Sequence, residues 1–341
     1  VAEQTIEVVL ANVGADTVES VQVHWSLNGL PQDDQLFTLN LLPEGDTAHL
    51  VIGLNNFSSF QTDTLRIWTS MPNEVADLQP ENDTLEAIFR LSLSGPYTIG
   101  GSSPDFATIG EAVTTLNTYH TCGPVTFRIR DGVYTEQISI DSIPTTSSTN
   151  TITFESESLD SSAVTIQYTP FNSTNPAVFL LKGTDHVTFR HLGFKALPSG
   201  YSDVLELRYS ADHLTVSNCY FEGYHFGSSS VLIKCLNYGG FSDTMTIENS
   251  YFLNGQQAIY LYNGGFSQHE INIHQNTFVN QRFGGLDVSF IRGLYILNNK
   301  FTSNTTSSSY KAIDLNSSDK YIEISGNDIS LSSAGSGMFL D

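Results

Sequence analysis

The stretch Ile247-Glu248-Asn249-Ser250-Tyr251-Phe252 contains the pattern that decides the fold, an apolar residue followed five positions later by Phe or Ile. The pattern recurs at Phe189 to Phe194, Val216 to Phe221, Ile273 to Phe278, Ile296 to Phe301 and Ile324 to Ile329. A second apolar position recurs every 27 residues, at Val178, Leu205, Leu232, Ile259, Leu286 and Ile313. Repeats with periods of about 20–50 residues indicate a solenoid or an array.

The composition of the repeats predicts strands rather than helices. Their apolar runs are short and rich in β-branched and aromatic residues, and no helical stretch separates them, so each repeat is expected to form one coil of a right-handed parallel β-helix. Polar residues follow the first apolar position, at His191, Asn218, Asn249, Gln275 and Asn298, and then at Asn276, Asn299 and Asn327. Because asparagine tolerates a left-handed backbone, these residues predict stacked turns between coils.

The expected fold class is all-β, with two domains. Residues 1–95 alternate apolar and polar positions between turn residues such as Asn28-Gly29, which predicts an immunoglobulin-like β-sandwich. Residues 96–341 contain the β-helix, and its last apolar unit at Met338 to Asp341 is expected to be truncated. Between the two, Phe106 to Leu116 places its apolar residues on one helical face, which predicts a helix that caps the open end of the β-helix.

Charge excludes some classes of partner. The 341 residues carry a net charge of −22 with only 14 lysines and arginines, so nucleic-acid binding is not expected. No apolar run is long enough to span a membrane, so membrane insertion is not expected either. The acidity suits a secreted protein that works outside cells or at the cell surface. Both ends of the sequence look cut, which indicates a segment of a longer polypeptide.

The first domain resembles the bacterial cell-adhesion-related (CARDB-like) domains. The resemblance lies in Leu10 to Gly14, Trp25 to Gly29, Leu42 to Gly45 and Pro80 to Thr84. It implies a spacer or binding unit of a large surface protein, without catalytic residues.

The start of the β-helix resembles the pectin methylesterases, through Asp105 to Val113 and Asp131 to Glu136. Those segments imply a fold and not a chemistry. Gly240-Phe241-Ser242-Asp243-Thr244-Met245 is similar to the motif that carries an acid in that family, which would place the acid at Asp243. Serine replaces the glutamine of that motif at Ser242, and the family's second aspartate motif is missing at Tyr262 to Phe266. A general acid without a partner carboxylate cannot run two-carboxylate chemistry, so methylesterase activity is not expected.

The 27-residue period gives a different candidate site. It places Asp287 and Asp314 in one outward column with Glu206 and Tyr260, and it places Tyr262 in the next column with Arg208, Ser289 and Asn316. Neighbouring carboxylates raise one pKa or recruit a cation such as Ca²⁺. Asp287 and Asp314 are therefore candidate catalytic or metal-binding residues, and Tyr260 and Tyr262 are candidate sugar-stacking residues. The alternative is a solvated face on which acids and tyrosines recur by chance.

Short motifs bear on the compartment. Asp followed by Thr or Ser and an apolar residue is similar to the O-glycosylation motif of bacteria with type IX secretion. The candidate acceptors are Thr17, Thr47, Thr64, Thr84, Ser142 and Thr244. Asn56-Phe57-Ser58 and Asn172-Ser173-Thr174 are N-linked sequons. These motifs agree with export.

Two functions are weighed. The main expectation is a structural or adhesive segment of a large bacterial surface or appendage protein, a glycoprotein whose partner is a glycan or other copies and segments of a surface protein. The alternative is a polysaccharide-active β-helix enzyme, lyase-like or esterase-like. The incomplete catalytic set favours the first, and a polysaccharide lyase is the reaction expected if the chain is an enzyme.

Overall fold

A computed structural model describes most of the chain, and the residues divide into two compact units, Val1–Ser92 and Leu93–Asp341. The described residues are 4–55, 62–77, 79–90, 92–224, 230–236, 243–304, 308–318, 320–331 and 336–340. The sequon at Asn56 and the motif residues Gly240 to Ser242 lie outside them.

The first unit consists of antiparallel strands. β1 (Gln4–Ala11) pairs with β5 (Thr47–Asn55), and a second sheet has the order β3-β2-β6-β7 with β4 paired to β2. The bounds in the second sheet are β2 (Val18–Leu27), β3 (Leu30–Pro31), β4 (Gln35–Leu42), β6 (Thr62–Ser70) and β7 (Thr84–Arg90), with short 3-10 turns η1 (Pro72–Glu74) and η2 (Pro80–Asn82). Trp25 is 5% exposed in its core, where Gly53 leaves room for the indole. The strands agree with a sandwich, and the immunoglobulin-like assignment stays a prediction.

The second unit begins with strand β8 (Leu93–Ile99), which pairs in parallel with β9 and so starts the β-helix before Pro96. Helix α1 (Ile109–Tyr119) overlaps the predicted segment, begins three residues later and ends three residues later, and buries Ile109, Ala112, Val113 and Leu116. The Thr108 side chain accepts a hydrogen bond from Glu111 N, as a capping residue does. The role of the helix as a cap of the coil stays a prediction.

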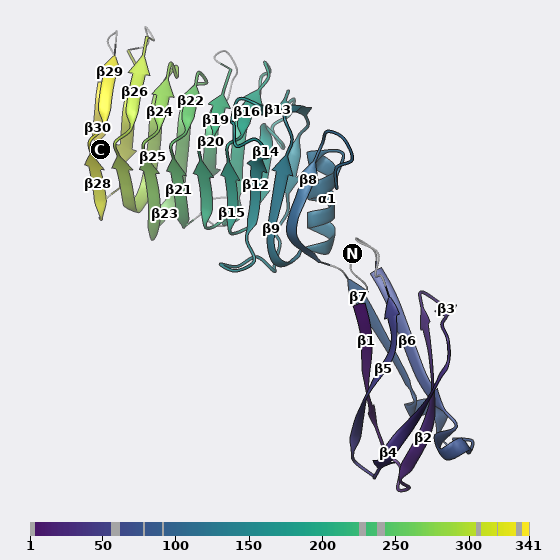
Figure 1. The fold of residues 1–341 in the computed structure, drawn as a ribbon. Coiled ribbons are helices and arrows are strands. Elements are labelled where there is room, and N and C mark those ends of the chain that lie inside the picture. Colours follow the sequence, from purple (N-terminus) through teal and green to yellow (C-terminus); the bar gives the residue numbers. More distant parts are fainter. Residues whose placement is uncertain are drawn as a thin grey trace. The chain divides into compact units, whose positions relative to one another are not determined.

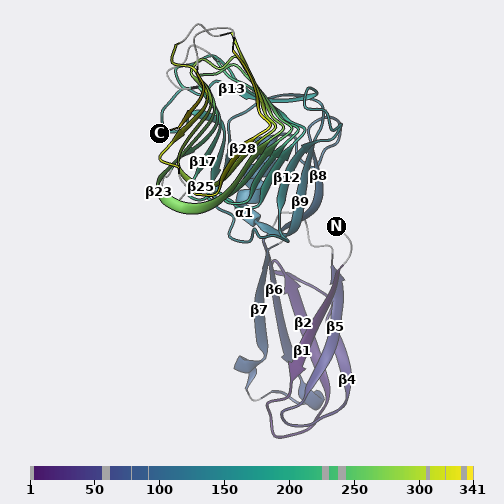
Figure 2. The same cartoon turned by 90° about the vertical axis from the view of Figure 1, so that its left-hand side faces the viewer.

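The rest of the second unit is a parallel β-helix with three walls (Figures 1 and 2), which confirms the predicted parallel solenoid. The first wall contains β8, β9 (Thr121–Ile129), β12 (Ile152–Ser156), β15 (Val187–Arg190), β18 (Leu214–Ser217), β21 (Thr244–Glu248) and β28 (Ile322–Ser325). The second wall contains β11 (Ile138–Ile140), β14 (Ala177–Lys182), β17 (Asp203–Arg208), β20 (Val231–Leu236), β27 (Lys311–Asn316) and β30 (Ser336–Leu340). The third wall contains β10 (Gly132–Thr135), β13 (Val164–Tyr168), β16 (Gly193–Ala196), β19 (Tyr220–Glu222), β22 (Tyr251–Leu253), β24 (Thr277–Val279), β26 (Lys300–Ser303) and β29 (Asp328–Leu331).

Two long strands join the first and second walls. β23 (Gln257–His274) pairs with β20 through Gln257 to Tyr262 and with β21 through Glu270 to His274, and β25 (Gly284–Leu297) bends in the same way. Figure 2 shows the curve of β23 and β25 along this edge. The first and second walls therefore belong to one hydrogen-bonded sheet.

Stacked aromatic rings fill the interior. Phe194, Phe221, Phe252, Phe278 and Phe301 are fully buried, and their ring centroids follow one another at 5.0, 5.0, 4.9 and 4.7 Å. These distances match the strand spacing of about 4.8 Å, so each coil contributes one ring to a continuous stack. The register confirms the aromatic column predicted from the sequence.

The polar turns are also confirmed. His191, Asn218, Asn249, Gln275 and Asn298 have φ between 48 and 58°, in the left-handed region. Beside them, Asn276 and Asn299 are buried, and the Asn299 Oδ1 atom accepts hydrogen bonds from the Asn276 backbone and side chain at 2.9 and 3.1 Å.

One predicted register is wrong at two coils. The structure pairs Phe179, and not Val178, with Leu205, and it pairs Ile233, and not Leu232, with Leu205 and Ile259. The coil from Leu205 to Ile233 is one residue longer than the 27-residue period, and the next coil is one residue shorter. Lys234, which a strict period does not select, therefore occupies the outward column between Glu206 and Tyr260.

Candidate functional site

Asp287 and Asp314 lie on the second wall as the sequence predicts. They are in-register partners on β25 and β27, and Tyr260 precedes them on β23. Parallel strands lie about 4.8 Å apart, so the two carboxylates start from neighbouring backbone positions. Tyr262, Ser289 and Asn316 form the next outward column, also as predicted.

A second column of residues faces the same side of the second wall. Strict alternation of side chains along a strand would place this column on the opposite face. Each coil has two consecutive buried residues here, Ala258-Ile259, Gly285-Leu286 and Ala312-Ile313. The residues just before these pairs, Gln257, Gly284 and Lys311, therefore line one cavity together with Asp287 and Asp314. The 27-residue period alone does not predict Gln257 or Lys311 as residues of this site.

The cavity has a volume of about 250 Å³. Its lining consists of Gln257, Phe283, Gly284, Leu286, Asp287, Ser309, Lys311 and Asp314. Gly284 stands between Gln257 and Lys311 in register, and a Cβ atom there would lie 2.8 Å from the Lys311 carbonyl oxygen. The missing side chain keeps the middle of the cavity open.

The two carboxylates have partners of different charge. The Lys311 ammonium donates a 2.7 Å hydrogen bond to Asp314 Oδ2. Gln257 Nε2 donates a 2.7 Å hydrogen bond to Asp287 Oδ2, and the amide carries no charge. Burial raises the pKa of Asp287, and the Asp314 carboxylate raises it further, whereas the Gln257 hydrogen bond and Lys311 act in the opposite direction. The pair therefore consists of Asp314, which is bound by a cation, beside Asp287, whose pKa is raised.

The hydrogen bond from Lys311 uses only one of the two carboxylate oxygens of Asp314. Its side chain is 15% exposed, and its Oδ1 atom is buried without a hydrogen-bond partner among the described residues. A buried carboxylate oxygen without a partner is costly, so a proton, a water molecule or a ligand hydroxyl at this position would be stabilised.

The structure separates the other candidates from this cavity. Asp243 is exposed at the turn before β21, where its backbone N–H donates to Asp212 Oδ1 at 2.6 Å. Tyr262 is 38% exposed and packs edge-on against Phe290, with a centroid distance of 5.7 Å. Neither Tyr260 nor Tyr262 lines the cavity, and their role in sugar stacking stays a prediction.

Metal binding and glycosylation stay predictions as well. Among the described residues, no group of three or more His, Cys, Asp or Glu side chains is placed to hold a metal ion. A Ca²⁺ ion between Asp287 and Asp314 would compete with the Lys311 ammonium. Four candidate glycosylation sites are exposed, at Thr17, Thr47, Thr84 and Ser142, and Thr64 and Thr244 are half-buried.

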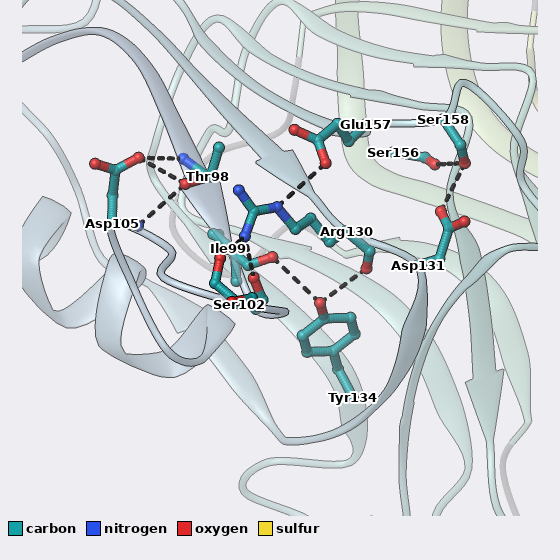
Figure 3. Close-up of polar contacts among 11 residues, drawn as sticks. Thr98, Ile99, Ser102, Asp105, Arg130, Asp131, Tyr134, Ser156, Glu157 and Ser158 are labelled. Atoms are coloured by element: carbon teal, nitrogen blue, oxygen red, sulfur yellow. Dashed lines mark hydrogen bonds and ion pairs between the residues drawn. The ribbon is translucent and has the colours of Figure 1, made fainter.

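The segment at the first coil that resembles the pectin methylesterases is held by structural contacts (Figure 3). Tyr134 donates from its hydroxyl to the Arg130 carbonyl at 2.8 Å, and Arg130 donates to the Ser102 carbonyl at 2.5 Å and pairs with Glu157 at 3.2 Å. Asp131 accepts a 2.7 Å hydrogen bond from the Ser158 hydroxyl. These side chains fix the first coil, which agrees with the reading that this segment reports the fold.

The comparisons with known proteins concern the fold. No protein-family model matches the sequence, and no curated protein matches it. The solved structures similar to this chain include pectin methylesterase from Aspergillus niger, with 16% identity, a TM-score of 0.47, and coverage of 72% of this chain and 87% of that one. Pectin methylesterase PemA from Erwinia chrysanthemi has 12% identity, a TM-score of 0.37, and coverage of 67% and 68%. The carrot pectin methylesterase has 12% identity, a TM-score of 0.36, and coverage of 73% and 84%.

These findings correct the main functional expectation. The similar solved structures are named as pectin methylesterases and a GH87 alpha-1,3-glucanase catalytic domain, and at identities of 16% or less they concern the fold alone. The second wall also carries a cavity with two carboxyl groups in unequal environments, Asp287 and Asp314, which are the candidate residues predicted from the 27-residue period. The structural or adhesive expectation is corrected accordingly, because these findings agree better with the enzyme alternative. Among the described residues, no helix is long and apolar enough to cross a membrane.

Proposed function

We propose that this chain is a polysaccharide-active hydrolase that cleaves an ester group carried by a glycan. The observation that supports this proposal is the in-register pair Asp287 and Asp314 at one cavity, with Gln257 on the first carboxyl group and Lys311 on the second. Hydrolysis by two carboxyl groups needs one acid and one base, and the raised pKa of Asp287 suits the acid.

The proposed reaction assigns one role to each carboxyl group. The Asp314 carboxylate, paired with Lys311, takes a proton from a water molecule that attacks the ester carbonyl carbon. The protonated Asp287 gives its proton to the alcohol oxygen as the carbon–oxygen bond breaks. One water and one ester become one acid and one alcohol, and a proton returns from Asp314 to its neighbour Asp287. Gln257 is a positioning residue, because it binds the Oδ2 atom of Asp287.

The size of the cavity favours an ester that projects from the glycan chain. Ligand pockets that enclose a whole small molecule have volumes of about 300–1,000 Å³, and this cavity holds about 250 Å³. A pendant methyl or acetyl ester fits such a space, whereas cleavage between two sugar rings needs room for both rings. Phe283, which is 37% exposed, gives the rim an apolar surface against which a sugar ring can pack.

The test is an assay of the purified chain on methyl-esterified, acetylated and unesterified polysaccharides. Released methanol or acetate reports ester hydrolysis, new reducing ends report glycoside hydrolysis, and unsaturated ultraviolet-absorbing products report a lyase. Asp287→Asn and Asp314→Asn are each expected to reduce ester cleavage by about 10²–10⁴-fold, the usual contribution of acid–base catalysis.

Two control variants sharpen this test. Glu222→Gln breaks the matched ion pair between Lys195 and Glu222, which is 2.9 Å long and lies on the third wall, and should leave the rate unchanged. Asp243→Asn should also leave the rate unchanged, although the resemblance to the pectin methylesterases would make Asp243 the acid. Reducing ends or unsaturated products in place of a released alcohol or acid would overturn the ester assignment, and no product at all would overturn the enzyme.

We also propose that the protein is exported, with the first unit as an immunoglobulin-like accessory domain. The net charge of −22 supports this proposal, as do the exposed acceptors Thr17, Thr47, Thr84 and Ser142. Mass spectrometry of the protein from its natural host should find glycans at these positions, and unmodified peptides would contradict the glycosylation.

A further inference from the structure

Three charged residues stand side by side on the first wall, far along the chain from the cavity. Arg128 on β9, Glu155 on β12 and Arg190 on β15 are in register on three successive parallel strands. Figure 1 shows these strands next to one another near the start of the β-helix. The backbone positions of the two arginines are therefore roughly 9–10 Å apart, with the glutamate between them.

The glutamate is buried, and the arginines are not. The Glu155 side chain is 6% exposed, whereas Arg128 and Arg190 are 52% and 46% exposed. Arg128 Nε donates to Glu155 Oε1 at 3.3 Å, and Arg190 Nε donates to Glu155 Oε2 at 2.5 Å. Each carboxylate oxygen thus holds one arginine. The contact uses one of the five N–H donors of each guanidinium, and the others remain for a ligand.

The charge balance of this group is unusual among the described residues. Other ion pairs of the β-helix there include contacts of one cation with one carboxylate, such as Arg130–Glu157, Lys182–Asp141 and Lys195–Glu222. Here two guanidinium groups share one carboxylate, which leaves a local charge of +1 in a chain of net charge −22. Guanidinium forks match the planar geometry of carboxylate and the oxygens of sulfate.

A column of hydroxyl groups lies next to the arginines. Thr126, Thr153 and Thr188 are in register two residues before Arg128, Glu155 and Arg190, and all three are half-buried. Residues two apart on a strand face the same side of a sheet. The face therefore offers guanidinium donors for an anion and hydroxyl groups for the hydroxyl-rich chain that carries it.

We propose that Arg128, Glu155 and Arg190 form a binding site for a carboxylate or sulfate group of an anionic glycan, separate from the Asp287 and Asp314 cavity. Glu155 acts here as a positioning residue that fixes the two guanidinium groups. The site lies on the first wall and includes none of the residues of the proposed hydrolase. An experiment can therefore support or contradict it independently of that activity.

Affinity electrophoresis of the whole chain at about 0.1 M salt tests this proposal, with polygalacturonate, dextran sulfate and neutral dextran in the gel. The wild-type protein should be retarded by polygalacturonate or dextran sulfate and not by dextran, and the two charged polymers distinguish carboxylate from sulfate. The double variant Arg128→Gln/Arg190→Gln should bind about tenfold more weakly or worse, as expected when charged hydrogen bonds are lost. Lys195→Gln removes the same type of charge on the third wall and should bind like the wild type, and so should Asp314→Asn.

The Glu155→Gln variant distinguishes a site in which Glu155 positions the two arginines from simple charge attraction. It removes a negative charge, so charge alone predicts tighter binding, whereas the proposed site predicts weaker binding because the arginines lose their anchor. Arg128→Lys/Arg190→Lys keeps both charges but loses the forks, and it should also bind more weakly; its thermal unfolding and that of Glu155→Gln check that each variant folds. Equal or tighter binding by these folded variants, equal retardation by single-stranded DNA, or no retardation of the wild type would overturn the proposal.

Discussion

Asp287 and Asp314 are in-register neighbours on adjacent parallel strands, yet the first accepts a hydrogen bond from a neutral amide and the second from an ammonium group. The difference arises one column away, where Gln257 and Lys311 stand on either side of Gly284. The repeat places Asp287 and Asp314 at equivalent backbone positions. Gln257, Gly284 and Lys311 of the neighbouring column then give the two carboxyl groups different environments.

The pH dependence of the rate follows from this inequality. Burial raises the pKa of Asp287, so the carboxyl group stays protonated above the usual range for aspartate. Because the proposed acid works only when protonated, the rate of ester cleavage should fall as the pH rises through that raised pKa. A rate profile from pH 3 to pH 9 measures this limb. Asp287→Asn should abolish the fall in rate at high pH, and a rate that keeps rising with pH in the wild type would contradict the role of Asp287 as acid.

The same pKa shift makes a prediction about stability. The folded state binds the Asp287 proton more tightly than the unfolded chain does, so the shift lowers the free energy of unfolding as the pH rises from the unfolded value toward the folded one. The Asp287→Asn variant lacks this pH-dependent decrease in the free energy of unfolding. Its asparagine side-chain oxygen can still accept the hydrogen bond from Gln257. The melting temperature of the variant at pH 7 should therefore exceed that of the wild type. Below pH 3.5 the two proteins should melt together, and a lower melting temperature of the variant at pH 7 would contradict the raised pKa.

Gly284 links the shape of the cavity to activity. Gly284 lines the cavity, and a Cβ atom at this position would lie 2.8 Å from the Lys311 carbonyl oxygen. Gly284→Ala should therefore cost about 1–3 kcal/mol of stability, as overpacking does, and should lower the rate as well.

Gly193→Ala is the matched control for this substitution. A Cβ atom at Gly193 would lie 2.8 Å from the carbonyl oxygens of both Ser161 and Val164, so the crowding on the third wall is at least as severe as at Gly284. The control should lose stability and keep the rate per folded molecule. Equal rates for both variants would show that the cavity around Gly284 does not hold the substrate.

The sequence predicts the parts of this structure that follow its period. The aromatic stack, the left-handed turns and the adjacency of Asp287 and Asp314 all depend on residues that recur at one place in successive coils. Gln257 and Lys311 were missed because alternation assigns residues three positions apart to opposite faces. The signal was present in the consecutive apolar pairs 258–259, 285–286 and 312–313, which turn both columns outward.

The remaining features cannot be predicted from a fixed period, because the coils that carry them differ in length. Glu155 lies 27 residues after Arg128 but 35 residues before Arg190, so no fixed period joins the three. Lys234 was missed for the same reason, because its coil is one residue longer than the repeat. The pKa of Asp287 depends on burial by neighbours from three coils, which spacing alone does not give.

The buried asparagine ladder gives the last prediction. Asn299 Nδ2 donates to the Ile273 carbonyl at 2.8 Å, and its Oδ1 accepts from the backbone N–H of Asn276 at 2.9 Å. Asn299→Ala leaves both backbone groups buried without these partners, and each such group costs about 1–3 kcal/mol. The two groups together cost about 2–6 kcal/mol, so the melting temperature should fall by at least about 4 °C, at about 2–4 °C for each kcal/mol. Calorimetry against Asn304→Ala, an exposed asparagine after β26, checks this, because an equal fall in both variants would show that the ladder contributes no more than a surface residue does.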